Sequence, residues 1–366
     1  MGGNAFKNIN IVRMNNVEFK NVSKKLVNIL KDILNSEEVA ILPYYDNKPF
    51  FSDVDIMLCN EDISNFEKEN NVNFFEYCNK LFSGEGIAIN NDSLVSIAVP
   101  INKAHTEFAQ VDLMPHPREN FYKNLIFYGY NDLNVLVNRF ISIPLFNAKY
   151  TSDGVEINIY REKGNIDMLL GIAKTENSAL EYLSFLDLDI NKFKKGFSTK
   201  EEIFDFILSS KYFDTNTFNS QIKINNSSEK LRLRRDVYRT FIDYVKDKDF
   251  KSGTKVIDSL EVLFDNFDTL KKQSEMFFKQ YDDYIIFKQR FNTENINAIL
   301  GLESKDLIGG KVIKTFLKER EVYKNKELIE TVNRMNDEEF KNMLNERRVL
   351  INEKEKANIK SKKRIL

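Results

Sequence analysis

Apolar and polar positions follow two different patterns along the chain, which predict a first half of mixed strands and helices and a second half of helices. In the first half, apolar residues recur at helical spacing over residues 15–36 and 65–82. Short apolar runs predict strands over residues 39–43, 51–58, 93–99 and 106–114. These elements predict a small mixed sheet backed by helices.

The pattern after residue 114 predicts a helix over 127–140, a hairpin over 149–156 and a strand over 167–173. From Thr175 on, helical spacing continues over residues 177–188, 199–210, 228–244, 255–270, 276–291 and 324–354. Thr199 and Glu202 have the spacing of a capping box, which predicts a helix start. We therefore predict an α+β chain with domains over 1–174, 175–250 and 251–366, the last two helical and the last ending in a basic tail.

Composition narrows the class of protein. The 366 residues are 42% hydrophobic and 30% charged, which is typical of a soluble globular protein with a sizeable core. The formal net charge of -1 neither supports nor excludes a nucleic-acid partner. Two cysteines are too few for a disulfide framework, and no apolar run suits a membrane span or a secretory signal. We therefore expect a cytoplasmic protein, in the host cytoplasm if it is viral, with no membrane partner.

Candidate chemistry is concentrated in three carboxylates on the predicted sheet. Asp53 and Asp55 begin an apolar strand and, because side chains alternate along a strand, both project from one face with α-carbons roughly 6 to 7 Å apart. Asp112 interrupts an apolar run on a second predicted strand, where an unpaired charge is costly. Two divalent cations would satisfy all three acids, in the arrangement used for in-line displacement at phosphorus.

The spacing of the acids is not specific by itself. Asp-x-Asp also occurs at residues 187–189 and 247–249, at helix ends or in charged turns where carboxylates are solvated or cap a terminus. The pair at residues 53–55 differs in its context. A turn and Ser52 precede it, an apolar strand follows it, and a third acid lies on a compatible strand.

Residues 51–58 (FSDVDIML) followed by residues 110–114 (QVDLM) resemble the active-site signature of the DNA polymerase beta-like nucleotidyltransferases. That superfamily includes tRNA CCA-adding enzymes, poly(A) polymerases and oligoadenylate synthases. The resemblance covers roughly residues 37–115. A looser likeness, over residues 2–6, 13–14 and 185–213, is to uncharacterised predicted nucleotidyltransferases of phage and fungal genomes.

The resemblance implies a nucleotidyltransferase-type catalytic domain over residues 1–174 that uses two Mg²⁺ ions, with Mn²⁺ as an alternative. Carried over residue by residue, Asp53 and Asp55 would hold the metal bound to the triphosphate. Asp112 would complete the second metal site and help to activate the attacking hydroxyl. The implied activity is template-independent transfer of a nucleoside monophosphate.

One feature of the superfamily is replaced in this chain. A Gly-Gly or Gly-Ser pair usually precedes the acids and cradles the triphosphate, but no glycine lies between Val39 and Leu58. We expect Lys48, Ser52 and backbone amides of the turn over residues 43–48 to bind the triphosphate instead. In an alternative, Gly2-Gly3 folds back to supply the glycines.

Basic residues supply further candidate contacts. Arg118 follows Asp112 closely and is predicted at the rim of the site, against phosphate, although a loop arginine is more often solvated. A second set shares one face of a predicted helix and would suit an RNA backbone, or else pairs with neighbouring acids. It consists of Arg232, Arg235 and Arg239. Lys305 and Lys311 flank glycines at a predicted helix start, which suits a phosphate or is a plain helix–helix connection.

These observations lead to three alternative functions. The first is transfer of a nucleoside monophosphate, from ATP or CTP by preference, to a hydroxyl acceptor such as a tRNA-like RNA 3′ end. The second is nucleotidylation of a protein or a small molecule. The third is an inactive nucleotide- or RNA-binding module on the same scaffold, which the absence of the glycine pair motivates.

Overall fold

The structure is a computed structural model of the whole chain. It describes residues 5–89, 94–141, 148–163, 166–176, 178–213, 230, 232–246, 260–303, 308–316 and 326–362. The chain forms two compact units, of which unit 1 comprises Met1–Ile157 and Lys174–Leu270, and unit 2 comprises Asn158–Ala173 and Lys271–Leu366. A mixed sheet lies in the N-terminal part and helices dominate the C-terminal half, so the predicted α+β class is confirmed.

A five-stranded mixed sheet carries the core of unit 1, with its strands in the order β2-β4-β7-β6-β5. The strands are β2 (Val39–Ile41), β4 (Asp53–Cys59), β5 (Ile87–Ile89), β6 (Val95–Pro100) and β7 (Phe108–His116). β4 and β7 are parallel, whereas the other neighbouring pairs are antiparallel. Because β7 lies between β4 and β6, its side chains can meet residues of both strands.

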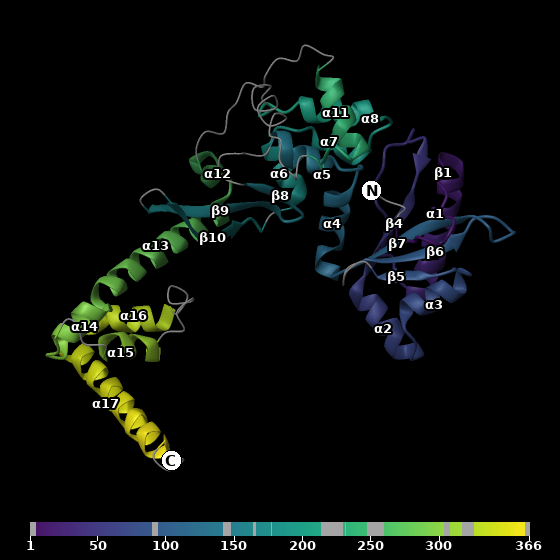
Figure 1. Cartoon of the computed structure of the whole chain (residues 1–366). Helices are drawn as coiled ribbons and strands as arrows, with labels where there is room; N and C mark the ends of the chain where they lie inside the picture. Colours follow the sequence, from purple (N-terminus) through teal and green to yellow (C-terminus); the bar gives the residue numbers. More distant parts are fainter. Residues whose placement is uncertain are drawn as a thin grey trace. The chain divides into compact units, whose positions relative to one another are not determined.

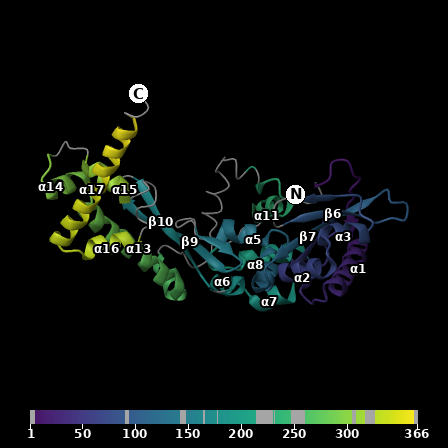
Figure 2. The same cartoon turned by 90° about the horizontal axis from the view of Figure 1, so that it is seen from below.

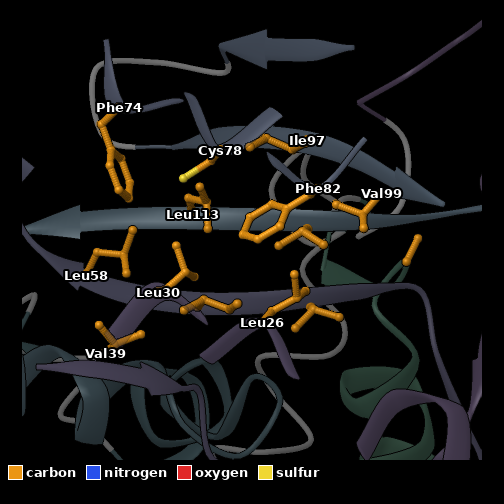
Figure 3. Packing of buried hydrophobic residues seen from close by; sticks show 14 of the residues in the cluster. Leu26, Leu30, Val39, Leu58, Phe74, Cys78, Phe82, Ile97, Val99 and Leu113 are labelled. Carbon is orange, nitrogen blue, oxygen red and sulfur yellow. The ribbon is translucent and has the colours of Figure 1, made fainter. Parts of the chain in front are cut away.

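One face of this sheet is covered by helices α1 (Asn16–Leu34), α2 (Asn60–Asn70) and α3 (Phe74–Leu81) (Figures 1 and 2). Val54, Ile56 and Leu58 alternate along β4 and enter the core on that face. Figure 3 shows Leu58 packed with Leu30 of α1 and Leu113 of β7. Burial of each such side chain contributes roughly 1.5 to 3 kcal/mol. This burial fixes the strand orientation and directs the alternate residues of β4 and β7 to the other face.

The residues before α1 run beside the start of β7. Val12 N donates to Phe108 O at 2.9 Å, and Phe108 N donates to Asn10 O at 3.1 Å. β1 (Met14–Asn15) then pairs with β3 (Phe50–Phe51). Asn15 caps α1 with a capping box, in which its side chain accepts from the amide of Glu18 at 3.0 Å. The N-terminal segment is thereby joined to the strands that carry the acids.

The rest of unit 1 is mainly helical. Its helices are η1 (Arg118–Asn120), α4 (Phe121–Tyr128), α5 (Leu133–Leu136), η2 (Val137–Ile141), α6 (Ala179–Phe185), α7 (Ile190–Lys195), α8 (Lys200–Leu208), α11 (Asp236–Lys246) and α12 (Leu260–Asn266). The predicted hairpin is present, because β8 (Lys149–Thr151) pairs with β9 (Gly154–Lys163), and β10 (Ile166–Lys174) completes a three-stranded sheet. The segment Asn158–Ala173 of this sheet belongs to unit 2. The predicted helix start at Thr199 is also present, since its side chain accepts from Glu202 N at 3.2 Å.

Unit 2 has a helical core of its own. It contains most of α13 (Asp268–Arg290), together with α14 (Thr293–Ile299), α15 (Ile308–Phe316), α16 (Lys326–Arg334) and α17 (Asp337–Lys362). Phe287, Phe291 and Phe340 are buried in this core. Arg290 stacks over Phe340, with its guanidinium carbon 4.7 Å from the ring centre, and its Nη2 donates to Asp337 at 2.8 Å.

The structure corrects the boundaries of two predicted helices. The helix predicted over 324–354 is two helices, because Asn336 forms a capping box with Glu339 that starts α17. The helix predicted over 65–82 is α2 and α3, separated at Asn71, which has a φ of 51°. The three predicted domains stay a prediction, and the two compact units divide the chain after Ile157, Ala173 and Leu270. No helix in the described part of the chain has both the length and the apolar character of a membrane span.

Candidate metal centre

The register of the sheet brings the three carboxylates together. Asp55 lies opposite Asp112 across the parallel β4–β7 pair, and Asp53 lies opposite Gln110. Since directly opposite residues share a face, all three acids lie on the face away from the core. Each offers a carboxylate oxygen, and these oxygens all lie within 4.8 Å of one another. The acids meet in space as the alternation of the two strands predicts.

Burial and mutual repulsion make this cluster unfavourable without a cation. Burial and the charges of Asp53 and Asp112 raise the pKa of Asp55 to about 8, although nearby Lys48 opposes the rise. Burial also raises the pKa of Asp112, against hydrogen bonds that favour its ionised form. Without a cation, therefore, the cluster favours a bound proton that the coupled acids share.

The donor set suits a hard divalent cation. Three carboxylates supply oxygen ligands, which Mg²⁺ and Mn²⁺ prefer over nitrogen or sulfur. A cation would also relieve the repulsion that raises the pKa of Asp55. The residues present thus fit the Mg²⁺ or Mn²⁺ that the resemblance implies.

Lys48 and Ser52, the predicted triphosphate ligands, both lie beside the acids. Burial lowers the pKa of Lys48, and the charges of Asp53 and Asp55 oppose this effect. Lys48 Nζ donates to Asn131 Oδ1 at 2.7 Å and lies 4.5 Å from the centre of the Phe51 ring. Ser52 Oγ donates to Asp53 Oδ1 at 3.4 Å. The structure therefore places a cationic and a hydroxyl side chain at the edge of the cluster.

Three backbone amides of the turn that carries Lys48 donate to carbonyl groups of the protein. Asp46 N donates to Phe197 O at 3.0 Å, Asn47 N donates to Ser198 O at 2.9 Å, and Lys48 N donates to Tyr45 O at 3.2 Å. These three amides are not open to a phosphate, which corrects that part of the prediction. The Lys48 side chain remains a candidate phosphate ligand of this turn. Gly2 and Gly3, the alternative, lie outside the described residues.

A strained turn holds Lys48 in place. Tyr130, Asn131 and Asp132 have φ values of 59°, 48° and 68°, a conformation that costs roughly 1 to 2 kcal/mol for a residue such as Tyr and less for Asn or Asp. Tyr130 N donates to Pro43 O at 2.6 Å, which ties this turn to the start of the Lys48 turn. The Nδ2 atom of Asn131 is buried and has no hydrogen-bond partner among the described residues. Such strain is concentrated at functional sites.

Arg118 does not join the acids. β4 and β7 run in parallel away from the carboxylates, and Arg118 comes after the far end of β7, at His116. Four residue steps along the strand lead from Asp112 to His116, which corresponds to about 13 Å. The Arg118 guanidinium pairs instead with Glu38 and Asp62. The prediction that Arg118 lies at the rim of the site is therefore corrected.

Glu38 and Asp62 form a second acidic group with Cys59, and their ligand atoms also lie within 4.8 Å of one another. Arg118 already supplies the positive charge for both carboxylates. Burial raises the pKa of Cys59 to about 11, so its thiol stays protonated. This group therefore has a structural explanation in ion pairing.

The predicted basic helix face is not continuous. α11 begins at Asp236, so Arg232 and Arg235 precede it and do not share a helical face with Arg239. Arg235 pairs with Asp132, and Arg239 pairs with Asp236 at 2.8 Å. Arg235 and Arg239 are therefore paired with acids of unit 1, as the alternative prediction states.

Gly309, two residues before Lys311, has a packing role. Gly309 N donates to Asn297 Oδ1 at 2.9 Å, and a Cβ at Gly309 would lie 2.5 Å from the same oxygen. That amide is thus engaged with α14 and not open to a phosphate. Lys311 is exposed on α15, whereas Lys305 lies outside the described residues.

Three residues beside the acids are missed at the level of sequence. Ser96 and Gln110 donate to Asp112, and Asn131 accepts from Lys48. Gln110 carried a signal, because it is a polar residue in an apolar strand, two positions before Asp112 and on its face. Ser96 and Asn131 reach the site only through strand register and tertiary folding.

No protein-family model matches this chain, and no curated protein matches it in sequence. The nucleotidyltransferase resemblance therefore rests on the residues of the candidate metal centre and its sheet.

Proposed function

We propose that this chain is a metal-dependent nucleotidyltransferase, which moves a nucleoside monophosphate from a nucleoside triphosphate to a hydroxyl acceptor. The observation that carries the proposal is the convergence of Asp53, Asp55 and Asp112 on one face of β4 and β7. Lys48, beside them, supports it by adding a positive charge where a triphosphate would lie.

The proposed reaction forms a bond from the acceptor oxygen to the α-phosphorus and breaks the bond from that phosphorus to the oxygen bridging the β-phosphate. Pyrophosphate leaves, and the proton of the acceptor hydroxyl passes to solvent water. Divalent cations, when bound, neutralise the charge that develops on the phosphoryl oxygens. Asp53 and Asp55 would hold the cation on the triphosphate, and Asp112 the cation next to the acceptor. Lys48 and Ser52 would bind phosphate oxygens.

We favour ATP or CTP as the donor and an RNA 3′ end as the acceptor. The reason is the extent of the chain beyond the sheet, since unit 2 has a separate helical core and a small acceptor would need less surface. Nucleotidylation of a protein or a small compound is the competing outcome, and the location of the label distinguishes the two.

The proposal is tested by Mg²⁺-dependent incorporation of nucleotide labelled at the α-phosphate into RNA. We expect Asp53→Ala and Asp112→Ala to abolish incorporation while the circular dichroism spectrum is retained. Asp187→Ala is the matched control, because Asp187 belongs to another Asp-x-Asp and its carboxylate pairs with Lys211. Incorporation that persists in both site variants would refute the proposal.

A further inference from the structure

Asp112 is held by hydrogen bonds from two buried side chains. Ser96 Oγ donates to Oδ1 at 2.6 Å, and Gln110 Nε2 donates to Oδ1 at 2.9 Å and to Oδ2 at 3.0 Å. Ser96, Gln110 and Asp112 are 0%, 4% and 6% exposed, so water competes little for these contacts. The contacts follow from the sheet, because Ser96 lies opposite Asp112 and Gln110 lies two residues before it.

These hydrogen bonds make the two oxygens of Asp112 different. A carboxylate oxygen has acceptor capacity for about two partners. Oδ1 already accepts from Ser96 and Gln110, whereas Oδ2 accepts, among the described residues, from Gln110 alone. Oδ2 is therefore the oxygen with capacity left for a cation. Without the two donors the carboxylate could turn about χ2, a broad torsion that fixes no single orientation.

Gln110 is itself oriented from the N-terminal segment. Ala5 N donates to Gln110 Oε1 at 3.0 Å across a sequence separation of 105 residues. Because the Ala5 amide takes the oxygen end of the Gln110 side chain, the nitrogen end is directed at Asp112. The pairing of Asn10 and Val12 with Phe108 anchors the same segment to β7.

We propose that Gln110 is a positioning residue, oriented by the backbone amide of Ala5, which fixes Asp112 so that Oδ2 faces the cation. Outer hydrogen-bond partners of a metal ligand typically change metal affinity about 10- to 100-fold. The inference rests on the proposed function, because the cation is the one that nucleotidyl transfer would use. It concerns cation binding, however, and this can be measured without turnover.

The test is the Mn²⁺ affinity of the full chain, measured from the electron paramagnetic resonance signal of free Mn²⁺ after chelator treatment. We expect Gln110→Leu to weaken binding about tenfold or more. Ala5→Pro, which removes the amide donor, should weaken it in the same direction, whereas Ala5→Gly keeps the amide and should match the wild type. Asn124→Leu is the matched control, because Asn124 is also a buried amide but contacts His116, at the far end of β7.

Wild-type affinity in Gln110→Leu would overturn the inference. Equal losses in Gln110→Leu and Asn124→Leu would do the same, because they indicate a general effect on folding. A wild-type chain that binds no Mn²⁺ would also overturn it. The proposed function can fail independently of this inference. If Mn²⁺ binding depends on Gln110 but no labelled nucleotide is transferred to any acceptor, the positioning role is supported and the proposed activity is refuted.

Discussion

Asp55→Asn is expected to stabilise the cation-free protein and to abolish its use of a cation. The pKa of Asp55 in the folded protein is about 8, above its ordinary value of 3.8, because of burial and two neighbouring acids. The folded protein therefore binds this proton more tightly than the unfolded chain does. Without a cation, the wild type should lose stability as the pH rises from about 4 to about 8. Asparagine has no charge to bury, so the variant should lose less.

The size of the effect follows from the pKa. At about 1.4 kcal/mol for each pKa unit, the difference between 3.8 and about 8 corresponds to at most about 6 kcal/mol. Asp55 is only partly shielded from solvent and shares its proton with two coupled acids, which lowers the net effect. We expect Asp55→Asn to stabilise unit 1 by roughly 2 to 3 kcal/mol at pH 8 and by almost nothing near pH 4.

Hydrogen exchange followed by mass spectrometry is the suitable assay, because it reports on unit 1 separately from unit 2. At each pH, the protection of the β4 and β7 amides against exchange is measured in the presence of chelator and is compared between Asp55→Asn and the wild type. Added Mn²⁺ should raise protection in the wild type and have little effect in Asp55→Asn. Equal destabilisation by Asp55→Asn at every pH would refute the reasoning, because repulsion between ionised acids must depend on pH.

Three further predictions concern residues around the site and in unit 2. Lys48→Ala should lower kcat/KM for the triphosphate about 10- to 100-fold through KM, measured by steady-state transfer kinetics, while Lys48→Arg retains part of the activity. Arg118→Ala should lower the midpoint of thermal unfolding, because Glu38 and Asp62 lose their guanidinium partner. It should leave the Mn²⁺ affinity unchanged, and a loss of affinity would contradict the ion-pairing role of Arg118. Gly309→Ala should destabilise unit 2 by about 1 to 3 kcal/mol, because the new Cβ would lie 2.5 Å from Asn297 Oδ1. Hydrogen exchange measures this effect, and wild-type protection of α14 and α15 in the variant would contradict it.

The acids of the candidate site could be predicted because their signal is local. Asp53, Asp55 and Asp112 interrupt apolar strands, and alternation alone assigns a face to each strand. The register that places Asp55 opposite Asp112, and Ser96 opposite Asp112 from the other side, depends on strand pairing. Sequence patterns therefore predict the convergence of the acids, but they do not predict that Ser96 of β6 donates a hydrogen bond to Asp112.

The remaining differences between the predictions and the structure also arise from tertiary folding. The left-handed turn at Asn131 brings that side chain to Lys48 from 83 residues away, and no local pattern predicts this contact. The short distance in sequence from Asp112 favours a position for Arg118 at the rim of the site. The intervening end of β7, however, leads the chain away from the acids. The predicted face of Arg232, Arg235 and Arg239 requires one continuous helix, whereas α11 begins only at Asp236.

The central claim is tested most directly by the identity of the product. The full chain is incubated with Mg²⁺, each of the four nucleoside triphosphates labelled at the α-phosphate, and total RNA. The account predicts label on RNA 3′ ends from ATP or CTP, which is removed by ribonuclease and is absent with chelator or with Asp112→Ala. The absence of label from RNA, protein and small compounds under both Mg²⁺ and Mn²⁺ would contradict it.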